Sequence, residues 1–268
     1  MNANDLTIIG AGELGGRVGR LWRKLHRQAE IVAETTTSVR HGSLLRWGLT
    51  PRLRAHRGEE SLSRVVFAIP SSAAQYQQEL KSALAAWNHT GPFVMVSSTG
   101  VFAEDRGQEV DEDGGLANHP RALRLIEAEN EVLVQRGIVI RMAGLYCLNR
   151  GPHRSYLNTA LSALEAEGLI NLIHYEDAAS LVVAALTKGT EGMVYLGTDG
   201  SALSRVELAR LAAGHFNSTR QIEFTGKEPS LGKRCKNERT RKLLNWTPQF
   251  ASFGDFLKVC ADLPSEIA

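Results

Sequence analysis

LTIIGAGELGGRVGRLW, residues 6–22, is the stretch that decides how this chain folds. Its short apolar, largely β-branched beginning predicts a buried strand, and the segment after the glycines has helical spacing. A dinucleotide pyrophosphate needs this strand–turn–helix arrangement, because it sits on bare backbone amides at the positive end of a helix. Gly10 permits the turn, Gly12 lets the backbone approach the phosphates, and Gly15 lets helix and strand pack closely. The stretch therefore predicts a dinucleotide site.

Strand-like and helix-like segments alternate through the first two thirds of the chain. Such alternation predicts parallel β–α–β units, whose crossover helices cover both faces of the sheet. We therefore predict an α/β fold, a Rossmann-type doubly wound parallel sheet. The expected strands after the first are residues 31–37, 52–54, 65–69, 93–96 and 138–140, and the expected later helices are 71 or 72 to 87 and 121–135.

The regular alternation of strand-like and helix-like segments ends at about residue 145. Glycine and polar residues predict a loop over 143–154. A helix over 155–167, a strand over 169–173, a helix over 175–186, a strand over 193–196 and a helix over 204–213 are expected next, and 216–236 suggests no element. We predict a single domain over 1–268. Its small substrate cap would be drawn from about 145–170 and 198–268.

The bulk composition predicts a globular protein that acts on a small molecule. A net charge of +2 and a charged content of 22% favour neither nucleic acid nor an acidic partner. No run approaches the roughly eighteen apolar residues of a membrane span, and the first residues lack the pattern of a signal peptide. Three scattered cysteines and histidines without ligand spacing predict neither disulfides nor a metal. We therefore expect a cytoplasmic protein. Four basic residues recur at helical spacing and are expected on a solvated helix face: Arg17, Arg20, Lys24 and Arg27.

Several motifs resemble the extended short-chain dehydrogenase/reductase family, over nearly the full length of the chain. They are the glycine loop, VSSTGVF at 96–102, RMAGLY at 141–146, IHYEDAA at 173–179, and the segment from Asn237 to Trp246. The likeness is greatest to an atypical branch of NAD(P)-dependent epimerases and dehydratases. It implies an NAD(P)-dependent oxidoreductase or epimerase-like activity on a small carbonyl, hydroxyl or nucleotide-sugar substrate. Relatives often dimerise through the helices after strands four and five, but Arg121 and Arg124 alter one of these helices, so a homodimer is one alternative and the oligomeric state stays open.

One departure from the family bears directly on chemistry. The family opens the helix after strand five with a Tyr, followed four residues later by a Lys, and this pair transfers protons. When Glu129 is aligned on the family's acidic position, Arg121 replaces the Tyr and Leu125 replaces the Lys. Arginine stays protonated, so it cannot shuttle protons, although it can hold a carboxylate or phosphate.

Three explanations of this departure stay open. Tyr146 is the best substitute acid–base group, because its loop follows a strand end and should face the nicotinamide. Alternatively, the reaction needs only hydride delivery and a polarising hydroxyl, for which Ser98 or Thr99 stands where the family keeps its substrate-orienting hydroxyl. The third explanation is a non-catalytic NAD(P)-binding regulator or scaffold. The predicted catalytic residues are thus Ser98, Thr99 and Tyr146.

The choice between NAD and NADP depends on the end of the second strand. Glu34 fits NAD, because an acidic side chain about twenty residues after the last glycine binds the ribose hydroxyls. The hydroxyls from Thr35 to Ser38, together with Arg40, fit the extra phosphate of NADP, and their number favours it slightly. The residues predicted to contact the cofactor are Gly10, Gly12, Glu13, Leu14, Gly15, Glu34, Thr35, Thr36, Arg40, Ala68, Ile69, Pro70 and Ser97.

Ligands of doubly wound sheets bind beyond the carboxyl ends of the strands. Arg150, His153 and Tyr156 cluster after the sixth expected strand, where they would bind an anionic substrate group or form an ordinary polar loop. With Arg121 they are the predicted substrate-binding residues. His174 and Asp177, at the start of an expected helix, are assigned structural roles.

Overall fold

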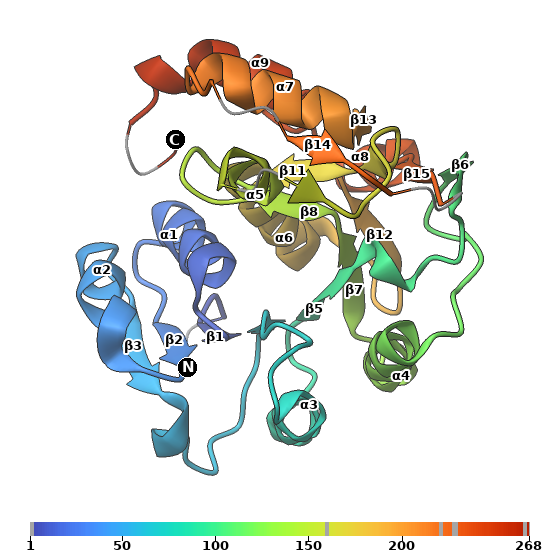
Figure 1. The fold of residues 1–268 in the computed structure, drawn as a ribbon. Coiled ribbons are helices and arrows are strands. Elements are labelled where there is room, and N and C mark those ends of the chain that lie inside the picture. Colours follow the sequence, from blue (N-terminus) through green and yellow to red (C-terminus); the bar gives the residue numbers. More distant parts are fainter. Residues whose placement is uncertain (1–2, 159–160, 220–221, 227–229, 265–266, 268) are drawn as a thin grey trace.

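A seven-stranded parallel sheet forms the centre of the computed structural model, which describes residues 3–158, 161–219, 222–226, 230–264 and 267 (Figure 1). The strand order is β12-β7-β5-β4-β1-β2-β3. This is a doubly wound Rossmann-type sheet, and it confirms the predicted fold class. Its strands are β1 (Leu6–Ile9), β2 (Ile31–Thr35), β3 (Thr50–Leu53), β4 (Val65–Phe67), β5 (Phe93–Ser98), β7 (Ile138–Met142) and β12 (Val194–Gly197).

Two helical layers cover the sheet because successive strand residues point to opposite faces. Ile8 packs in one core cluster with the side chains of α1 and α6, whereas Ile9 packs in another with those of α3 and α4. Figure 1 shows the two layers on either side of the sheet. Their helices are α1 (Glu13–Leu25), α2 (His41–Arg46), α3 (Tyr76–Ala86), α4 (Pro120–Val134) and α6 (Tyr175–Lys188), with short 3-10 turns η1 (Ser38–Arg40), η2 (Arg54–His56) and η3 (Thr99–Val101).

Most of the remaining elements gather over one end of the sheet, where the yellow-green to red part of the chain lies in Figure 1. Several of them share a third core cluster that includes Tyr146, Phe253 and Phe256. Small two-stranded sheets link them: β8 pairs with β11, β10 with β13, β9 with β14, and β6 with β15. Their bounds are β6 (Arg106–Val110), β8 (Gly144–Tyr146), α5 (Pro152–Asn158), β9 (Leu161–Ser162), β10 (Leu169–Ile170), β11 (Leu172–His174), β13 (Leu203–Ser204), α7 (Arg205–His215), β14 (Glu223–Phe224), β15 (Gly232–Cys235), α8 (Glu238–Leu244), α9 (Phe253–Val259) and η4 (Cys260–Asp262).

Most predicted elements of the sheet are present, and the main errors lie in the loops. The expected loop over 143–154 contains β8 and the start of α5, and the expected strand over 169–173 is divided into β10 and β11. The expected helix over 155–167 is wrong, because α5 ends at Asn158 and a strand follows; residues 159–160 lie outside the described part. The helix expected from 71 or 72 begins only at Tyr76, since residues 71–75 form turns beside the main cleft.

The expectation of a solvated basic face on α1 is wrong for Arg17 and Arg20. Both are buried, and their guanidiniums donate to the Glu176 carboxylate, at 3.0 Å from Arg17 Nε and 2.6 Å from Arg20 Nη2. Buried charges need such compensation, since an unpaired buried ion is strongly destabilising. The ion pairs therefore tie α1 to α6. None of the described helices is long and apolar enough to cross a membrane.

Candidate functional site

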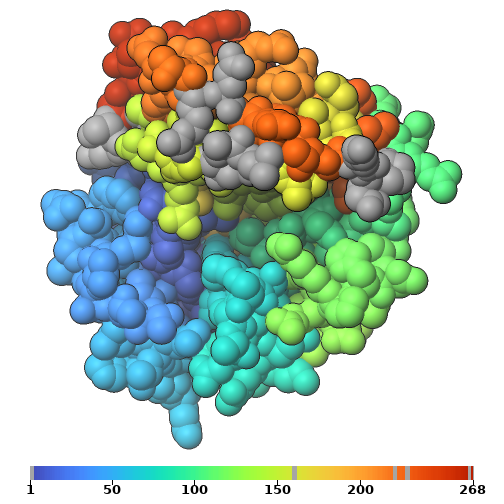
Figure 2. All heavy atoms as spheres, viewed as in Figure 1, coloured from blue at the N-terminus to red at the C-terminus, as the bar shows by residue number. Residues whose placement is uncertain are grey.

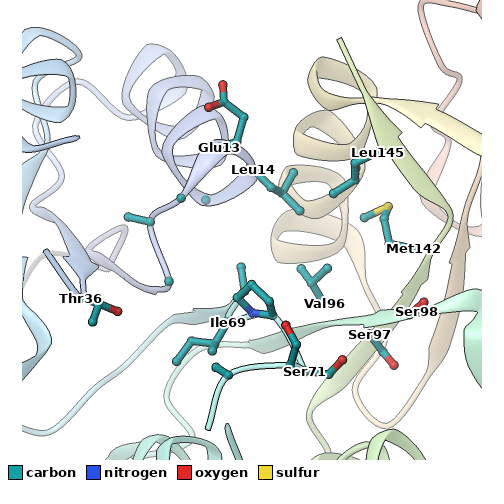
Figure 3. A pocket seen from close by; sticks show the side chains of 18 of the residues that line it. Glu13, Leu14, Thr36, Ile69, Ser71, Val96, Ser97, Ser98, Met142 and Leu145 are labelled. Carbon is teal, nitrogen blue, oxygen red and sulfur yellow. The ribbon is translucent and has the colours of Figure 1, made fainter. Parts of the chain in front are cut away.

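A cleft of about 1400 Å³ opens at the carboxyl ends of β1, β4 and β5. Figure 2 shows the molecular surface hollowed here, between the blue N-terminal elements and the yellow-green segment above them. In the close-up, Thr36 lies at one end of the cleft and Ser98, Met142 and Leu145 at the other, with Leu14 between them (Figure 3). This elongated cleft at the switch point of the sheet is the location that the Rossmann arrangement uses for ligands.

Each of the three glycines of the loop stands in different surroundings, which explain why a side chain would not fit or would intrude there. Gly10 has φ +98°, and a Cβ on it would lie 2.8 Å from the backbone of Ala68; a Cβ on Gly15 would lie 2.5 Å from the Gly10 carbonyl oxygen. Both positions are therefore required by the fold itself. No atom lies within 4 Å of the place where a Cβ on Gly12 would stand. The space above Gly12 is open to the cleft, which is what a closely approaching phosphate requires.

The start of α1 is suited to an anion. Gly12 is the N-cap and supplies no side-chain hydrogen bond, and the helical bonding begins with Gly16 N donating to Gly12 O at 3.0 Å. The preceding amides, those of Glu13, Leu14 and Gly15, have no carbonyl within the helix to bond. These amides and the positive end of the helix fit the pyrophosphate of a dinucleotide.

The Glu34 carboxylate, at the Thr36 end of the cleft, accepts hydrogen bonds from two arginines. Arg57 Nε lies 3.0 and 2.9 Å from its two oxygens, and Arg52 Nη2 lies 2.5 Å from Oε1. Glu34 is only 1% exposed. Its lone pairs are thus directed to guanidiniums and not to the ribose position.

Hydroxyls and cations occupy the rest of this end. Thr35 Oγ1 is 2.8 Å from His41 Nε2, and Thr36 is exposed to the cleft. Arg40 also lines it, and its Nη1 donates to Glu13 at 2.6 Å. Glu13 pairs with Arg17 as well, so that its charge is balanced within the protein. The predicted residues Ala68, Ile69 and Pro70 line the middle of the cleft.

Ser97 and Ser98 lie at the other end of the cleft in different environments. Ser97 Oγ donates to the buried Glu129 carboxylate at 2.5 Å, and Arg141 Nη2 donates to the same carboxylate at 2.8 Å. The Ser97 hydroxyl therefore donates its hydrogen bond within the protein and not to a ligand in the cleft. Ser98 Oγ accepts from Gly100 N at 3.1 Å and keeps its own proton free to face the cleft that it lines. Ser98 is the better placed of the two hydroxyls.

Thr99 is not among the described residues that line the cleft. It lies in η3, and its carbonyl accepts from Lys233 Nζ at 3.2 Å; the Phe102 carbonyl accepts from the same group at 2.9 Å. Burial lowers the pKa of Lys233. This lysine holds the loop after β5 in place, and no local sequence pattern predicts the contact.

The expectation that Tyr146 faces the nicotinamide is wrong for its side chain. Tyr146 is 0% exposed, and its ring packs edge-on against Phe253 and Phe256, at centroid distances of 5.1 and 5.4 Å. Its hydroxyl has no hydrogen-bond partner within the described residues, and burial raises its pKa. A tyrosine in this position is part of the core.

The four predicted substrate residues separate into two pairs. Arg121 and Arg150 line the cleft, whereas His153 and Tyr156 do not. His153 is buried, its Nε2 donates to the Leu148 carbonyl at 3.1 Å, and burial lowers its pKa. Tyr156 packs against Phe224 at a centroid distance of 5.8 Å. The expectation that these two bind substrate is wrong, since neither side chain reaches the cleft.

Sequence reasoning missed several cleft residues, and two of them have polar side chains of chemical interest. Arg124 follows Arg121 by one helical turn and lines the same wall; its three-residue spacing is the signal that identifies it. Tyr175 opens α6 and is the only tyrosine of the described residues that lines the cleft. The Arg17 guanidinium lies over its ring, 5.4 Å from the centroid. His174 and Asp177 have the predicted structural roles: His174 caps α6, and Asp177 accepts from the amides of residues 249 and 250.

Comparison with known proteins gives the fold independent support. No family model matches the chain, and no curated protein matches it. Solved structures do: a conserved protein of unknown function from Silicibacter pomeroyi has a TM-score of 0.78 at 19% identity, covering 96% of this chain and 98% of that one.

Two enzymes are similar over the same length. The dTDP-glucose 4,6-dehydratase of Bacillus anthracis, solved with NAD, has a TM-score of 0.75 at 15% identity, covering 95% of this chain and 94% of that one. The UDP-glucose 4-epimerase of Thermotoga maritima, solved with UDP-glucose, has a TM-score of 0.76 at 13% identity, covering 96% and 97%. The chain shares their fold. The resemblance that the sequence motifs indicated is thus confirmed for the architecture.

Proposed function

We propose that this chain binds a nicotinamide dinucleotide in the cleft and acts as an oxidoreductase or epimerase-like enzyme on a small carbonyl, hydroxyl or nucleotide-sugar substrate. The observation that carries the proposal is the open space above Gly12 beside the uncapped start of α1. The volume of about 1400 Å³ supports it, because it exceeds the ~300–1,000 Å³ of common ligand pockets and leaves room for a substrate beside the cofactor.

The cofactor, when bound, supplies or accepts a hydride at the end of the cleft opposite Thr36. There Ser98 would donate a hydrogen bond to the substrate oxygen and stabilise negative charge as it develops. Ser97 would form part of the cleft wall and would not bind the substrate, since its hydroxyl donates a hydrogen bond to Glu129. Apolar contacts from Val96, Met142 and Leu145 would exclude water from the reacting carbon.

NADP is the preferred form in this proposal. The Glu34 carboxylate is engaged by Arg52 and Arg57, so it neither accepts from the ribose nor repels a 2′-phosphate directly. Thr36 and Arg40 line the same end and would bind that phosphate through a hydroxyl and a guanidinium. The solved structures of MoeE5 with UDP-glucose and NAD belong to the same fold, and a nucleotide-sugar substrate is compatible with the cleft.

A regulator without turnover is the alternative. Arg121 and Leu125 in place of the family's proton-transfer pair, and the burial of Tyr146, favour it. The open cleft favours an enzyme, because no side chain of the described residues fills its proposed reacting end. A homodimer and a cytoplasmic location stay predictions.

Calorimetric titration with NADPH, NADP, NADH and NAD tests the binding step. Dissociation constants in the micromolar range, lower for the phosphorylated pair, are expected. Failure of all four to bind would refute the proposal. A screen of carbonyl compounds and sugar nucleotides, followed through the absorbance of the reduced nicotinamide, then separates the enzyme from the regulator.

A further inference from the structure

The charged residues of the cleft are out of balance. Among the described lining residues five are arginines and two are glutamates: Arg40, Arg54, Arg121, Arg124, Arg150, Glu13 and Glu34. Both glutamates already form ion pairs with arginines. No acidic side chain of the described lining is therefore left to balance the other cations.

Partners within the protein account for only some of the arginines. Arg40 pairs with Glu13, and Arg54 pairs with Glu79 at 3.2 Å. Arg121, Arg124 and Arg150 form no ion pair with any acidic residue of the described chain. Burial and, next, the positive charge of Arg150 lower the pKa of Arg40, so Arg150 lies on the same side of the cleft as Arg40.

Arg121 and Arg124 belong to the opposite, reacting end. Both are in α4, which packs against η3, the turn that directly follows Ser98. The two arginines are three residues apart and share one face of the helix, while Ala122 and Leu125 are buried on another face. The helix thus presents two neighbouring guanidiniums to the same cleft that Ser98 lines.

This arrangement is unfavourable for the helix by itself. Like charges three residues apart repel, and Arg121, a cation in the first turn, opposes the helix dipole. The first turn of α4 contains no acidic residue to offset them. A bound anion would relieve both effects, and this makes a ligand the simplest physical reason for the pair.

We propose that Arg121 and Arg124 together bind an anionic group of the substrate, a carboxylate or a phosphate monoester, beside the reacting carbon. The inference rests on the proposed function, because it assigns the reacting end to α4. Guanidiniums bind both groups through paired hydrogen bonds. The substrate would be held by its anion on α4 with its carbonyl or hydroxyl against Ser98, in the place where the family positions its catalytic tyrosine.

Calorimetry on the protein saturated with NADP tests this proposal. The probes are glycolate, methyl phosphate and glycolamide, which offer a carboxylate, a phosphate monoester and a neutral group of the same size as glycolate. The variants are Arg121→Gln, Arg124→Gln and the double variant. Arg106→Gln is the matched control, since Arg106 is an exposed arginine of β6 that does not line the cleft.

We expect glycolate or methyl phosphate to bind at least tenfold more tightly than glycolamide. The double variant should lose at least tenfold of this affinity, each single variant part of it, and Arg106→Gln none. Preference for glycolate identifies a carboxylate substrate and preference for methyl phosphate a phosphorylated one. The dissociation constant for NADP should stay within threefold in all variants, and their melting temperatures should be no lower than that of the unchanged protein.

Three results would overturn the inference: anions that bind no better than glycolamide, a double variant that keeps the anion affinity, or a double variant that loses NADP affinity in parallel. The last would assign both arginines to the cofactor. Absence of NADP binding in the unchanged protein is a different outcome, which refutes the proposed function. Titration of the same probes without cofactor then decides whether the arginine pair binds anions independently.

Discussion

Substitution of Gly12 by alanine should weaken dinucleotide binding more than it destabilises the fold. The Cβ would stand in open space, but the backbone at Gly12 has φ −73° and ψ −145°, a combination outside the regions that alanine prefers, so a moderate loss of stability is expected as well. The added methyl group would occupy the position that a phosphate must reach in order to accept from the amides of Glu13 and Leu14. Each such charge-assisted hydrogen bond contributes about 1.5–3 kcal/mol.

The expected loss of affinity follows from these values. If one bond of about 2 kcal/mol is lost, the dissociation constant rises by a factor of about 30, since about 1.4 kcal/mol corresponds to tenfold. The melting temperature should fall by about 2–4 °C for each kcal/mol of backbone strain, because the ψ of −145° disfavours alanine although no side-chain contact changes. Calorimetric titration with NADPH and a thermal unfolding curve measure the two quantities separately.

Two other glycines provide the controls. Gly15→Ala places a methyl group 2.5 Å from the Gly10 carbonyl oxygen. Overpacking of about 1–3 kcal/mol, partly offset by about 1 kcal/mol of helix propensity, should lower the melting temperature by about 2–4 °C. Gly214→Ala, in α7, adds a methyl group in open space and should leave binding unchanged. If Gly12→Ala binds NADPH as well as the Gly214→Ala control does, the phosphate is not on this loop and the reasoning is refuted.

Three further outcomes are expected. Glu34→Gln should destabilise the fold by about 3 kcal/mol, the low end for breaking a buried ion pair because Arg57 also reaches Glu79, and a thermal unfolding curve that does not change would contradict this. Burial raises the pKa of Asp199 to about 8, so the folded state keeps a proton that the unfolded state releases above about pH 4. Stability should therefore fall as the pH rises from about 4 to 8, and Asp199→Asn should flatten this decline in melting temperature. Ser98→Ala should lower hydride transfer at least tenfold, about 1.4 kcal/mol of barrier, whereas Tyr146→Phe should change it less than twofold; the reverse order of effects would reject the assignment.

Local patterns predicted the part of the site that the backbone builds. The loop from Gly10 to Gly15 is recognisable because its constraints lie within six consecutive residues: a positive φ, an open amide and a close helix–strand contact. The parallel sheet followed from the alternation of apolar and helical segments. These features depend on neighbours in the sequence, which a single chain displays directly.

Side-chain partners from distant segments decided what the sequence did not reveal. Tyr146 follows a strand end, as a catalytic residue would, but Phe253 and Phe256 from the end of the chain enclose it. Glu34 has the spacing of a ribose ligand, yet Arg52 in β3 and Arg57 beyond that strand donate to its oxygens. In both cases the residue has the expected position along the chain, but a contact from a distant segment takes up the side chain that was predicted to bind a ligand.

The ionisable groups that line the cleft also indicate which class of reaction suits the proposed site better. Under the proposed function, Arg121 and Arg124 stay protonated, Ser97 Oγ donates its hydrogen bond to Glu129, and Tyr146 lies outside the cleft. Tyr175 is then the one tyrosine of the described lining available for proton transfer. An epimerase or dehydratase needs a group that repeatedly takes and returns a proton, whereas reduction of a carbonyl needs positive charge near the developing oxyanion. We therefore expect hydride transfer to the carbonyl of an anionic substrate, and a Tyr175→Phe variant that loses turnover would instead assign proton transfer to Tyr175.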